Sequence, residues 1–332
     1  MRAVRLHGVG DIRAETVPAP PPPGPGEAAV RVLAAGICGS DLHNFRTGQW
    51  IARTPVIPGH EFMGEVVAVG PAVSGLAPGD RVIADSRVPC GACASCRAGR
   101  PNLCERMGYV GEVCDGGFAE RVVLKAAGLL PCPPELAPEI AALAEPLGVA
   151  LRVVRRLQGP ANAPVLVAGA GPIGGLAAIL LAHLGHGPLL VADRNAARRD
   201  LVCALTGAEA IDLDAIDALR TRRIPRMIEA TGSAAVLARL VEAVASGGRI
   251  VMVGIFHGEA TIAPNHLVER EVELMGSSVF IDEQREAVAL LPALAPKLAA
   301  VVSEPIGLDD VPAAYRRLIE GRADRLKTII RP

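Results

Sequence analysis

Aromatic side chains and net charge are what this 332-residue chain has least of. It contains one Trp, two Tyr and five Phe, and its 34 basic residues against 35 acidic ones leave a net charge of −1. A nucleic-acid surface needs clustered basic residues, and recognition of single strands adds aromatic stacking platforms. We therefore expect no nucleic-acid partner, and we expect aliphatic side chains to fill the cores.

The chain also lacks the segments typical of secreted and membrane proteins. Its start, Met-Arg-Ala-Val-Arg-Leu-His-Gly, contains no apolar core long enough for a signal peptide. Residues 157–192 contain no Asp, Glu, Lys or Arg, and that length would cross a bilayer. However, seven glycines and four prolines divide this stretch into a strand–turn–helix–turn–strand pattern. We therefore expect a cytoplasmic protein with no membrane contact.

Length and patterning indicate two domains, because a domain averages about 150 residues. In the first 150 residues, Gly/Pro turns separate short strands expected at 28–34, 63–69, 81–84 and 118–124. From about Leu151 buried strands alternate with helices, which predicts an α/β fold with a parallel, doubly wound sheet. The six strands expected there are 165–168, 189–192, 210–213, 227–230, 249–253 and 272–275, with a helix at 233–246. In the tail, helices are expected at 286–298 and 311–320 and a strand at 327–330.

A glycine-rich turn follows the first strand of this second region. Residues 169–174 read Gly-Ala-Gly-Pro-Ile-Gly and open a helix, and Asp193 ends the next strand about 20 residues on. Such glycines let a dinucleotide pyrophosphate approach the helix N-terminus. Asp193 can accept hydrogen bonds from both ribose hydroxyls of NAD and would repel the extra phosphate of NADP, although Arg194 and Arg198 lie close by. The alternative is an ordinary turn in an α/β sheet.

Four of the eight cysteines lie within fifteen residues, at positions 90, 93, 96 and 104. Four thiolates on one loop can close a tetrahedron around Zn²⁺ and leave no open position, as in structural zinc sites. An iron–sulfur motif is the main alternative, but it has a shorter last gap and a Pro after the final Cys, where this chain has Glu105. The pattern favours a structural zinc held by Cys90, Cys93, Cys96 and Cys104.

A second group of candidate ligands is spread along the chain. Residues 36–43 read Gly-Ile-Cys-Gly-Ser-Asp-Leu-His, Gly-His-Glu follows at 59–61, and Glu145 precedes the second domain. A Cys, a His and a carboxylate from separate segments are typical of a catalytic zinc that leaves a position for substrate. Each residue alone is ambiguous, since a single Cys is usually a small buried apolar residue. Their clustering favours a catalytic site.

With these motifs the whole chain resembles the zinc-dependent medium-chain dehydrogenase/reductase family. The motifs follow one another in order: Gly-Ile-Cys-Gly-Ser-Asp-Leu-His, Gly-His-Glu-Phe-x-Gly-Glu-Val, the four-cysteine lobe, Glu-Pro-Leu at 145–147, the glycine turn and Glu-Ala-Thr-Gly at 229–232. The chain is most similar to the polyol (sorbitol-type) and threonine dehydrogenase branches, because Glu-Pro-Leu replaces the third cysteine ligand of other alcohol dehydrogenases.

The resemblance implies two domains with the active site in the cleft between them. A GroES-like β domain would span residues 1–150, with the structural-zinc lobe at about 88–106, and the tail 283–332 would return to it. A NAD-binding Rossmann domain with a six-stranded parallel sheet would span 151–282. The resemblance also implies two zinc ions per chain and a homodimer or homotetramer.

The resemblance assigns roles to individual residues as well. It implies a catalytic zinc held by Cys38, His60 and Glu61, with Glu145 as a ligand directly or through water. Asp41 would orient His60 from outside the ligand set. Ser40 and His43 would form a proton relay whose outer end, at His43, faces water. Residues expected to contact NAD are Gly169, Gly171, Ile173, Gly174, Asp193, Arg198, Val253, Val279 and Phe280.

The expected reaction is the reversible oxidation of a small secondary alcohol, a polyol or sugar derivative, to the ketone with NAD⁺. Asn44, Arg152 and residues 281–282 depart from the sorbitol pattern, so the residues that grip a polyol are not carried over. A threonine- or butanediol-type dehydrogenase is one alternative. A non-catalytic, zinc-stabilised nucleotide-binding protein is another, although the presence of Ser40, His43 and Glu145 argues against it.

Overall fold

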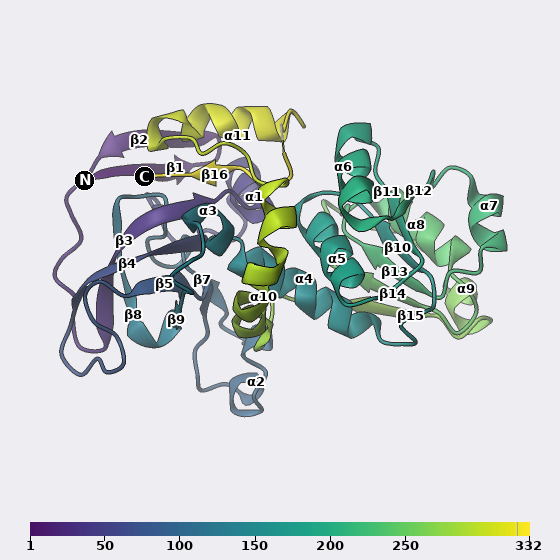
Figure 1. Cartoon of the computed structure of the whole chain (residues 1–332), viewed down its shortest axis with the longest axis horizontal. Coiled ribbons are helices and arrows are strands. Elements are labelled where there is room, and N and C mark those ends of the chain that lie inside the picture. Colours follow the sequence, from purple (N-terminus) through teal and green to yellow (C-terminus); the bar gives the residue numbers. More distant parts are fainter. Residues whose placement is uncertain (324) are drawn as a thin grey trace. The chain divides into compact units, whose positions relative to one another are not determined.

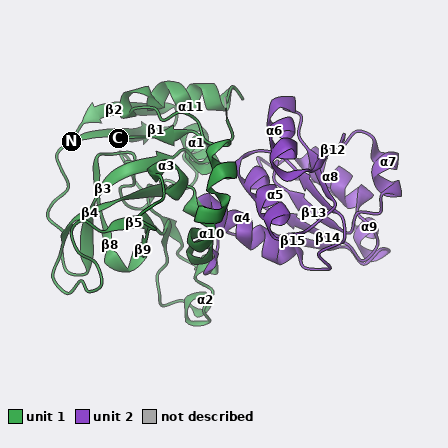
Figure 2. Cartoon of the chain, viewed as in Figure 1, with its two compact units in different colours: residues 1–145, 284–332 green, residues 146–283 purple. Residues whose placement is uncertain are grey.

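The computed structural model describes residues 1–323 and 325–332, which form two compact units (Figure 2). Unit 1 comprises residues 1–145 and 284–332, and unit 2 comprises residues 146–283. Each unit has its own aliphatic core. In the described part of the chain, no helix combines the length and the apolar character needed to cross a bilayer.

Unit 1 is built on an antiparallel sheet with the order β16-β3-β4-β5-β9, and β8 pairs with β3 (Figure 1). The last strand of the chain pairs with β3, so the C-terminal segment completes the sheet that the N-terminal residues begin. The strands expected at 28–34, 63–69 and 81–84 are confirmed. Their bounds are β3 (Glu27–Gly36), β4 (Glu61–Val69), β5 (Arg81–Ala84), β8 (Arg121–Lys125), β9 (Leu129–Pro131) and β16 (Ile329–Ile330).

The strand expected at 118–124 begins only at Arg121. Residues 116–118 instead donate backbone hydrogen bonds to the carbonyl oxygens of residues 57–59. Gly117 leaves room for Phe62, whose ring would lie 2.5 Å from an added Cβ. This segment therefore supports the chain just before β4 and does not extend β8.

Several short elements of unit 1 were not expected from the sequence. They include an antiparallel hairpin at the N-terminus and a small two-stranded ribbon, β6 with β7, that carries the four-cysteine lobe. Their bounds are β1 (Arg2–Gly8), β2 (Asp11–Thr16), β6 (Arg87–Val88), β7 (Gly108–Tyr109), α1 (Gly39–Thr47), α2 (Ala94–Arg97), α3 (Pro138–Ala141), η1 (Pro101–Leu103), η2 (Ala126–Gly128) and η3 (Leu308–Asp310). The helices expected in the tail are present as α10 (Glu283–Ala299) and α11 (Val311–Ile319).

Unit 2 is a parallel six-stranded sheet with the order β12-β11-β10-β13-β14-β15, flanked by helices (Figure 1). The chain moves outward from β10 to β12 and then returns to the other side of β10, which is the topology of a doubly wound nucleotide-binding sheet. All six expected strands are present. Their bounds are β10 (Val165–Ala168), β11 (Leu189–Ala192), β12 (Glu209–Ala210), β13 (Arg226–Glu229), β14 (Arg249–Met252) and β15 (Glu273–Gly276).

The helices of unit 2 follow their sequence signals closely. Ser233 caps α8 by accepting a hydrogen bond from the Val236 N–H at 3.4 Å, as the expected helix start requires. The third strand is shorter than expected, because after Ile211 the chain enters an Asp-rich turn. The helix bounds are α4 (Ala144–Leu157), α5 (Pro172–His183), α6 (Ala196–Thr206), α7 (Ile216–Thr221), α8 (Ala234–Ala243) and α9 (Pro264–Val268), with α4 starting in unit 1.

Candidate active site and metal centres

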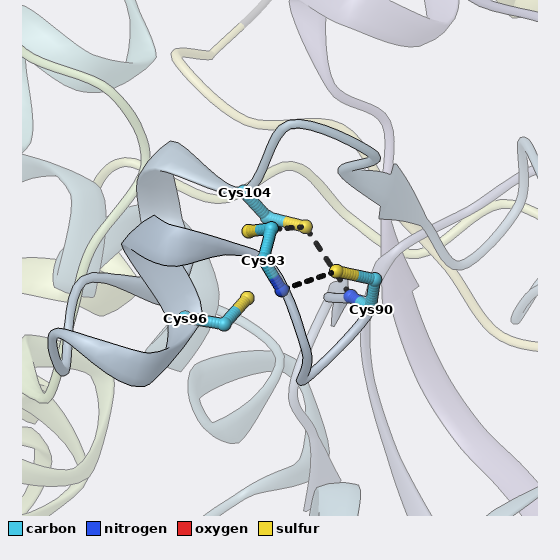
Figure 3. Close-up of side chains that lie close together, drawn as sticks. All are labelled: Cys90, Cys93, Cys96 and Cys104. Carbon is cyan, nitrogen blue, oxygen red and sulfur yellow. Dashed lines mark hydrogen bonds between the residues drawn. The ribbon is translucent and has the colours of Figure 1, made fainter.

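The four-cysteine lobe brings its sulfur atoms to a common centre (Figure 3). The four ligand atoms all lie within 4.8 Å of one another, and Cys93 Sγ is 3.9 Å from Cys104 Sγ. Cys90 and Cys93 come from the loop after β6, Cys96 lies on α2, and Cys104 follows η1. All eight cysteines of the chain are free, so this convergence is not that of a disulfide.

Backbone amides of the lobe point at the sulfur atoms. Cys93 N–H donates to Cys90 Sγ at 3.4 Å, and the N–H groups of Cys90 and Arg106 each donate to Cys104 Sγ at 3.3 Å. Such donors stabilise thiolates, and they lower the pKa of Cys90 to about 6. Burial raises the pKa of Cys96 to about 12. A cation at the centre would stabilise all four thiolates together.

The second group converges because β3 and β4 are paired. Their register sets Gly36 opposite Glu61, which brings the residues just after β3 next to the first residues of β4. As a result Cys38, His60 and Glu61 offer ligand atoms within 4.8 Å of one another. His60 and Glu61 are buried, and burial raises the pKa of the Cys38 thiol. The three residues predicted from separate segments therefore do meet.

Asp41 lies beside His60, where the sequence places it. One carboxylate oxygen accepts the Cys38 N–H at the start of α1, at 2.8 Å, and the other lies 3.6 Å from His60 Nδ1. On the opposite side of the imidazole, Ser40 Oγ is 3.3 Å from His60 Nε2. Asp41 thus fixes the helix start through a hydrogen bond, and its second carboxylate oxygen faces the imidazole of His60.

Glu61 has a partner that the sequence analysis did not identify, the lysine at position 327. Lys327 Nζ donates to both carboxylate oxygens of Glu61, at 2.7 and 2.6 Å, and to the Ile37 carbonyl oxygen at 3.2 Å. Both side chains are almost completely buried. Burial alone would lower the pKa of Lys327, but Glu61 raises it, so the pair is held as ions.

Glu145 is close to this group without being part of it. It stands outside the set of atoms within 4.8 Å, and its Oε1 accepts a hydrogen bond from Ser86 Oγ at 2.8 Å. Burial, with nearby Glu61 adding to its effect, raises the pKa of Glu145 to about 7. A carboxyl group with that pKa exchanges protons readily near neutral pH.

His43 differs from expectation in its exposure. The sequence analysis placed it at a water-facing end of a relay, but it is only 4% exposed. Its Nε2 lies 2.8 Å from Gln49 Oε1, and its ring stacks at 4.3 Å against Trp50. The loop after α1 covers the ring because Gly48 turns the chain back with a φ of 66°. His43 is therefore a buried side chain that is hydrogen-bonded to Gln49 and covered by Trp50.

The glycine turn of unit 2 has the geometry that its motif predicts. Gly169 has a φ of 102°, and a Cβ at Gly174 would lie 1.8 Å from the Gly169 carbonyl oxygen. Apart from its immediate chain neighbours, no atom of the described residues lies within 4 Å of a Cβ built on Gly171, so that glycine leaves open space at the N-terminus of α5. Packing explains the outer two glycines, and the middle one suits the close approach of a ligand.

Asp193 lies at the end of β11 and is already engaged by the protein. Its two carboxylate oxygens accept the N–H groups of Ala170 and Asn195, both at 2.7 Å. These bonds hold the carboxylate beside the glycine turn. Asn195 in turn caps α6 by accepting the Arg198 N–H at 3.1 Å.

The remaining residues expected to contact NAD differ in their exposure to solvent. Ile173, Arg198, Val253 and Val279 are partly buried, whereas Phe280 is completely buried. Val279 has a φ of 38°, an uncommon backbone conformation for a β-branched residue. Arg198 Nε is buried and donates no hydrogen bond within the described residues.

Known proteins match both units. Residues 24–134 match the family described as "Alcohol dehydrogenase GroES-like domain", and residues 172–293 match "Zinc-binding dehydrogenase". Sorbitol dehydrogenase of Bacillus subtilis (strain 168) is 28% identical over 344 residues, which cover 100% of this chain and 97% of that protein. L-threonine 3-dehydrogenase of Deinococcus deserti is 30% identical over 320 residues, and the match covers 92% of this chain and 92% of that protein.

A solved structure agrees over the full length. A Sinorhizobium meliloti 1021 protein described as a zinc-binding dehydrogenase, bound to NADP, has a TM-score of 0.92 and 31% identity. The match covers 100% of this chain and 99% of that one. The chain belongs to the zinc-dependent medium-chain dehydrogenase/reductase family. It is therefore an oxidoreductase that acts on CH–OH donors.

As a zinc-dependent dehydrogenase, the chain has donors that fit the metal at both centres. The lobe offers four sulfurs with backbone amides directed at them, which suits a closed, structural zinc. The buried centre offers a thiol, an imidazole with the Asp41 carboxylate beside it, and nearby carboxylates, which suits a zinc with an open position.

Lys327 and Ser86 are the site residues that sequence reasoning missed in this dehydrogenase. Lys327 carried one usable signal, because it opens the strand predicted at 327–330, which is otherwise mostly apolar, and a lysine buried in such a strand requires a partner. Nothing in the sequence indicated that the partner would be Glu61, 266 positions away. Ser86 lies in an ordinary loop and carried no signal.

Proposed function

We propose that this enzyme oxidises a small secondary alcohol, a polyol or sugar derivative, reversibly to the ketone with NAD⁺ as hydride acceptor. The observation that carries the proposal is the convergence of Cys38, His60 and Glu61, with Ser40 Oγ 3.3 Å from His60 Nε2. The similarity to sorbitol dehydrogenase supports the substrate class.

Cys38 and His60, with Glu61 or Glu145, would hold the catalytic zinc. When bound, zinc supplies a Lewis acid that lowers the pKa of an alcohol by several units. In the proposed mechanism Ser40 accepts the hydroxyl proton of the substrate and passes its own proton onward. His43, which is buried and hydrogen-bonded to Gln49, would receive the proton from Ser40 and pass it onward.

Glu61 and Glu145 differ in what holds them. Two hydrogen bonds from Lys327 neutralise Glu61, whereas Glu145 has one neutral hydroxyl donor and a pKa near 7. Glu145 is therefore the carboxylate with more freedom to accept a proton or to turn toward a metal. Glu61 keeps the centre charge-balanced through Lys327.

The cofactor is proposed to be NAD⁺ in preference to NADP⁺. Asp193 supports this, because its negative charge lies beside the glycine turn, where a 2′-phosphate would be repelled. The Asp193→Ala variant should raise the ratio of NADP⁺ to NAD⁺ catalytic efficiency about tenfold or more, as expected for loss of a charged contact. An unchanged ratio would show that Asp193 does not contact the ribose.

A substrate screen tests the proposal. Alditols, diols and L-threonine are offered with NAD⁺, and NADH absorbance is followed; a Cys38→Ser sample is the blank. We expect turnover of alditols or diols above that of threonine. A preference for threonine would favour the threonine-type alternative, and no turnover with two zinc ions bound would favour a non-catalytic nucleotide-binding protein. The expected homodimer or homotetramer is measured by sedimentation equilibrium on the same sample.

A further inference from the structure

The motif Glu-Ala-Thr-Gly at 229–232 begins at the carboxyl end of β13 and takes no part in the proposed proton transfer. In the sheet order β13 lies between β10 and β14, and the winding of the chain reverses between β10 and β13. Nucleotides bind at such a reversal, outside the carboxyl ends of the strands. The four residues therefore lie in the part of unit 2 where a bound cofactor is expected.

Glu229, the first residue of the motif, carries a completely buried carboxylate. Its Oε1 accepts hydrogen bonds from three groups of the turn that follows: the Thr231 N–H at 2.7 Å, the Gly232 N–H at 2.9 Å and the Thr231 hydroxyl. Burial raises the pKa of Glu229, and these hydrogen bonds oppose the rise. One carboxylate oxygen thus holds the turn together.

The other oxygen, Oε2, is buried and has no hydrogen-bond partner in the part of the chain that the structure describes. It lies against Gly254, where an added Cβ would be 2.6 Å from it. An unsatisfied buried oxygen lowers stability, and such exceptions are expected at functional positions. The carboxylate therefore calls for a functional explanation.

The two sides of the turn contact their neighbours differently. Toward β10 the contacts are made by backbone and methyl groups: the Ala230 N–H donates to the Ala168 carbonyl oxygen at 2.8 Å, and a Cβ on Gly169 would lie 3.0 Å from Thr231 Cγ2. Toward β14 the carboxylate itself lies against Gly254. Removing the carboxylate should therefore disturb the β14 side of the turn more than the side next to the glycine turn.

The segment just after β14 is fixed on this turn. The N–H groups of Val253 and Gly254 donate to the Glu229 carbonyl oxygen at 2.8 and 3.2 Å. Gly232 has a φ of 66°, and a Cβ there would collide with the Ile255 carbonyl oxygen. The carboxyl ends of β13 and β14 therefore form one packed unit with Glu229 at its centre.

We propose that Glu229 is a positioning residue that fixes the surface at the ends of β13 and β14 against which the nicotinamide half of the cofactor lies. The inference rests on the proposed function in its use of NAD⁺. Each half of a doubly wound sheet binds one mononucleotide. The glycine turn and Asp193 belong to the half formed by β10, β11 and β12, which leaves the nicotinamide to the half that begins with β13. Glu229 acts through the backbone around Val253, because its own carboxylate is buried.

Calorimetric titration of the zinc-loaded enzyme with NADH and with ADP-ribose tests the proposal. ADP-ribose keeps the adenosine and the pyrophosphate and lacks the nicotinamide. Glu229→Ala should weaken NADH binding about tenfold or more, as expected for the loss of hydrogen bonds to a charged group, and ADP-ribose binding by no more than about threefold. Glu273→Ala is the matched control, because Glu273 lies at the amino end of β15 in a pair with Arg249, and it should keep both affinities.

Thr231→Val is the second variant, in case Glu229→Ala does not fold. It removes the hydroxyl that donates to Glu229 and keeps the shape of the side chain. NADH binding should weaken about threefold or more with ADP-ribose binding unchanged, as for the loss of one hydrogen bond. Thr231→Ser keeps the hydroxyl and should bind NADH like the wild type.

The outcomes separate this inference from the proposed function. Equal weakening of NADH and ADP-ribose in Glu229→Ala overturns the inference, because Glu229 would then support the nucleotide site as a whole. Unchanged NADH binding overturns it as well. A wild type that binds neither ligand overturns the proposed cofactor and the inference with it. A wild type that binds NADH but oxidises no alcohol overturns the proposed reaction, and the affinities of Glu229→Ala still decide the inference.

Discussion

The four-cysteine lobe and the Cys38 centre solve the same problem, gathering metal donors, in opposite ways. The lobe takes all four ligands from residues 90–104, and the short helix within it has no buried residue. The Cys38 centre takes its side chains from β3–α1, the start of β4, the start of α4 and the last segment of the chain. The ligands of the lobe are close together in the sequence and partly exposed. The residues of the Cys38 centre are far apart in the sequence and mostly buried.

The difference shows what holds each centre together. A lobe without a hydrophobic core depends on its metal, because little apolar surface is buried to stabilise it. The surrounding fold holds the residues of the buried centre in place. Because charges are costly to bury, they are paired there, Asp41 with His60 and Lys327 with Glu61. Loss of metal should therefore unfold the first centre locally and leave the second nearly intact.

Cys38→Ser should give the largest loss of activity. Removing one ligand of the catalytic metal forfeits several kcal/mol of transition-state stabilisation, so kcat/KM should fall about 10⁴-fold or more. Bound zinc, measured by mass spectrometry of the metal, should fall from two to one per chain, while circular dichroism stays unchanged. Substantial activity in this variant would place the catalytic metal elsewhere.

Ser40→Ala should cost less, about 10²- to 10⁴-fold in kcat, because it removes a proton-transfer group but no ligand. Both zinc ions should remain bound. The control is Ser40→Thr, which keeps the hydroxyl and should retain most of the activity. If Ser40→Ala turned over at the wild-type rate, the relay would have to start at Glu145.

Lys327→Met tests the charge balance of the buried centre. It leaves Glu61 as an unpaired buried charge and should lower the free energy of unfolding in urea by about 3–5 kcal/mol. Adding Glu61→Gln should recover much of that loss. Lys125→Met is the matched control, because Lys125 forms an exposed pair with Glu27 and should cost less than about 1 kcal/mol. Equal losses in the two lysine variants would contradict the proposed role of the buried pair.

Much of the fold could be predicted because its signals are local. The six strands of unit 2 are short apolar runs between turn residues. Three of them begin at the expected residue, and the other three begin one residue away from it. The start predicted for the strand at 118–124 was wrong, because residues 116–118 form hydrogen bonds with the chain just before β4. That long-range contact has no local signal in the sequence. The N-terminal hairpin was not predicted, although Gly8 and Gly10 lie at its turn.

The identity of the site residues could be predicted from the sequence, but their burial and hydrogen-bond partners could not. The residues Cys38, His60 and Glu61 were found from motif resemblance, and the β3–β4 register brings them together. The partners Lys327 of Glu61, Ser86 of Glu145 and Gln49 of His43 depend on tertiary packing. The burial of His43 was wrong in the prediction for the same reason, since the covering loop is positioned by contacts distant in sequence.

The smallest effect on turnover is expected for Cys93→Ser, at the other centre. The lobe is joined to unit 1 through the two-residue ribbon of β6 and β7, and its surroundings are mostly exposed. Without its metal the lobe should open while the antiparallel sheet and the Cys38 site persist, because local regions with few apolar contacts unfold independently. Bound zinc should fall from two to one per chain, and proteolysis should cut within residues 88–106.

Stability and activity should respond differently to this change. The midpoint of thermal unfolding should drop by roughly 5 °C, equivalent to a loss of about 2 kcal/mol in the free energy of unfolding. The kcat should change by no more than about tenfold, much less than the change expected for Cys38→Ser. Ser95→Ala, a change on the same helix outside the ligand set, is the control and should retain both zinc ions. A Cys93→Ser enzyme as inactive as Cys38→Ser would show that the two centres are not separable.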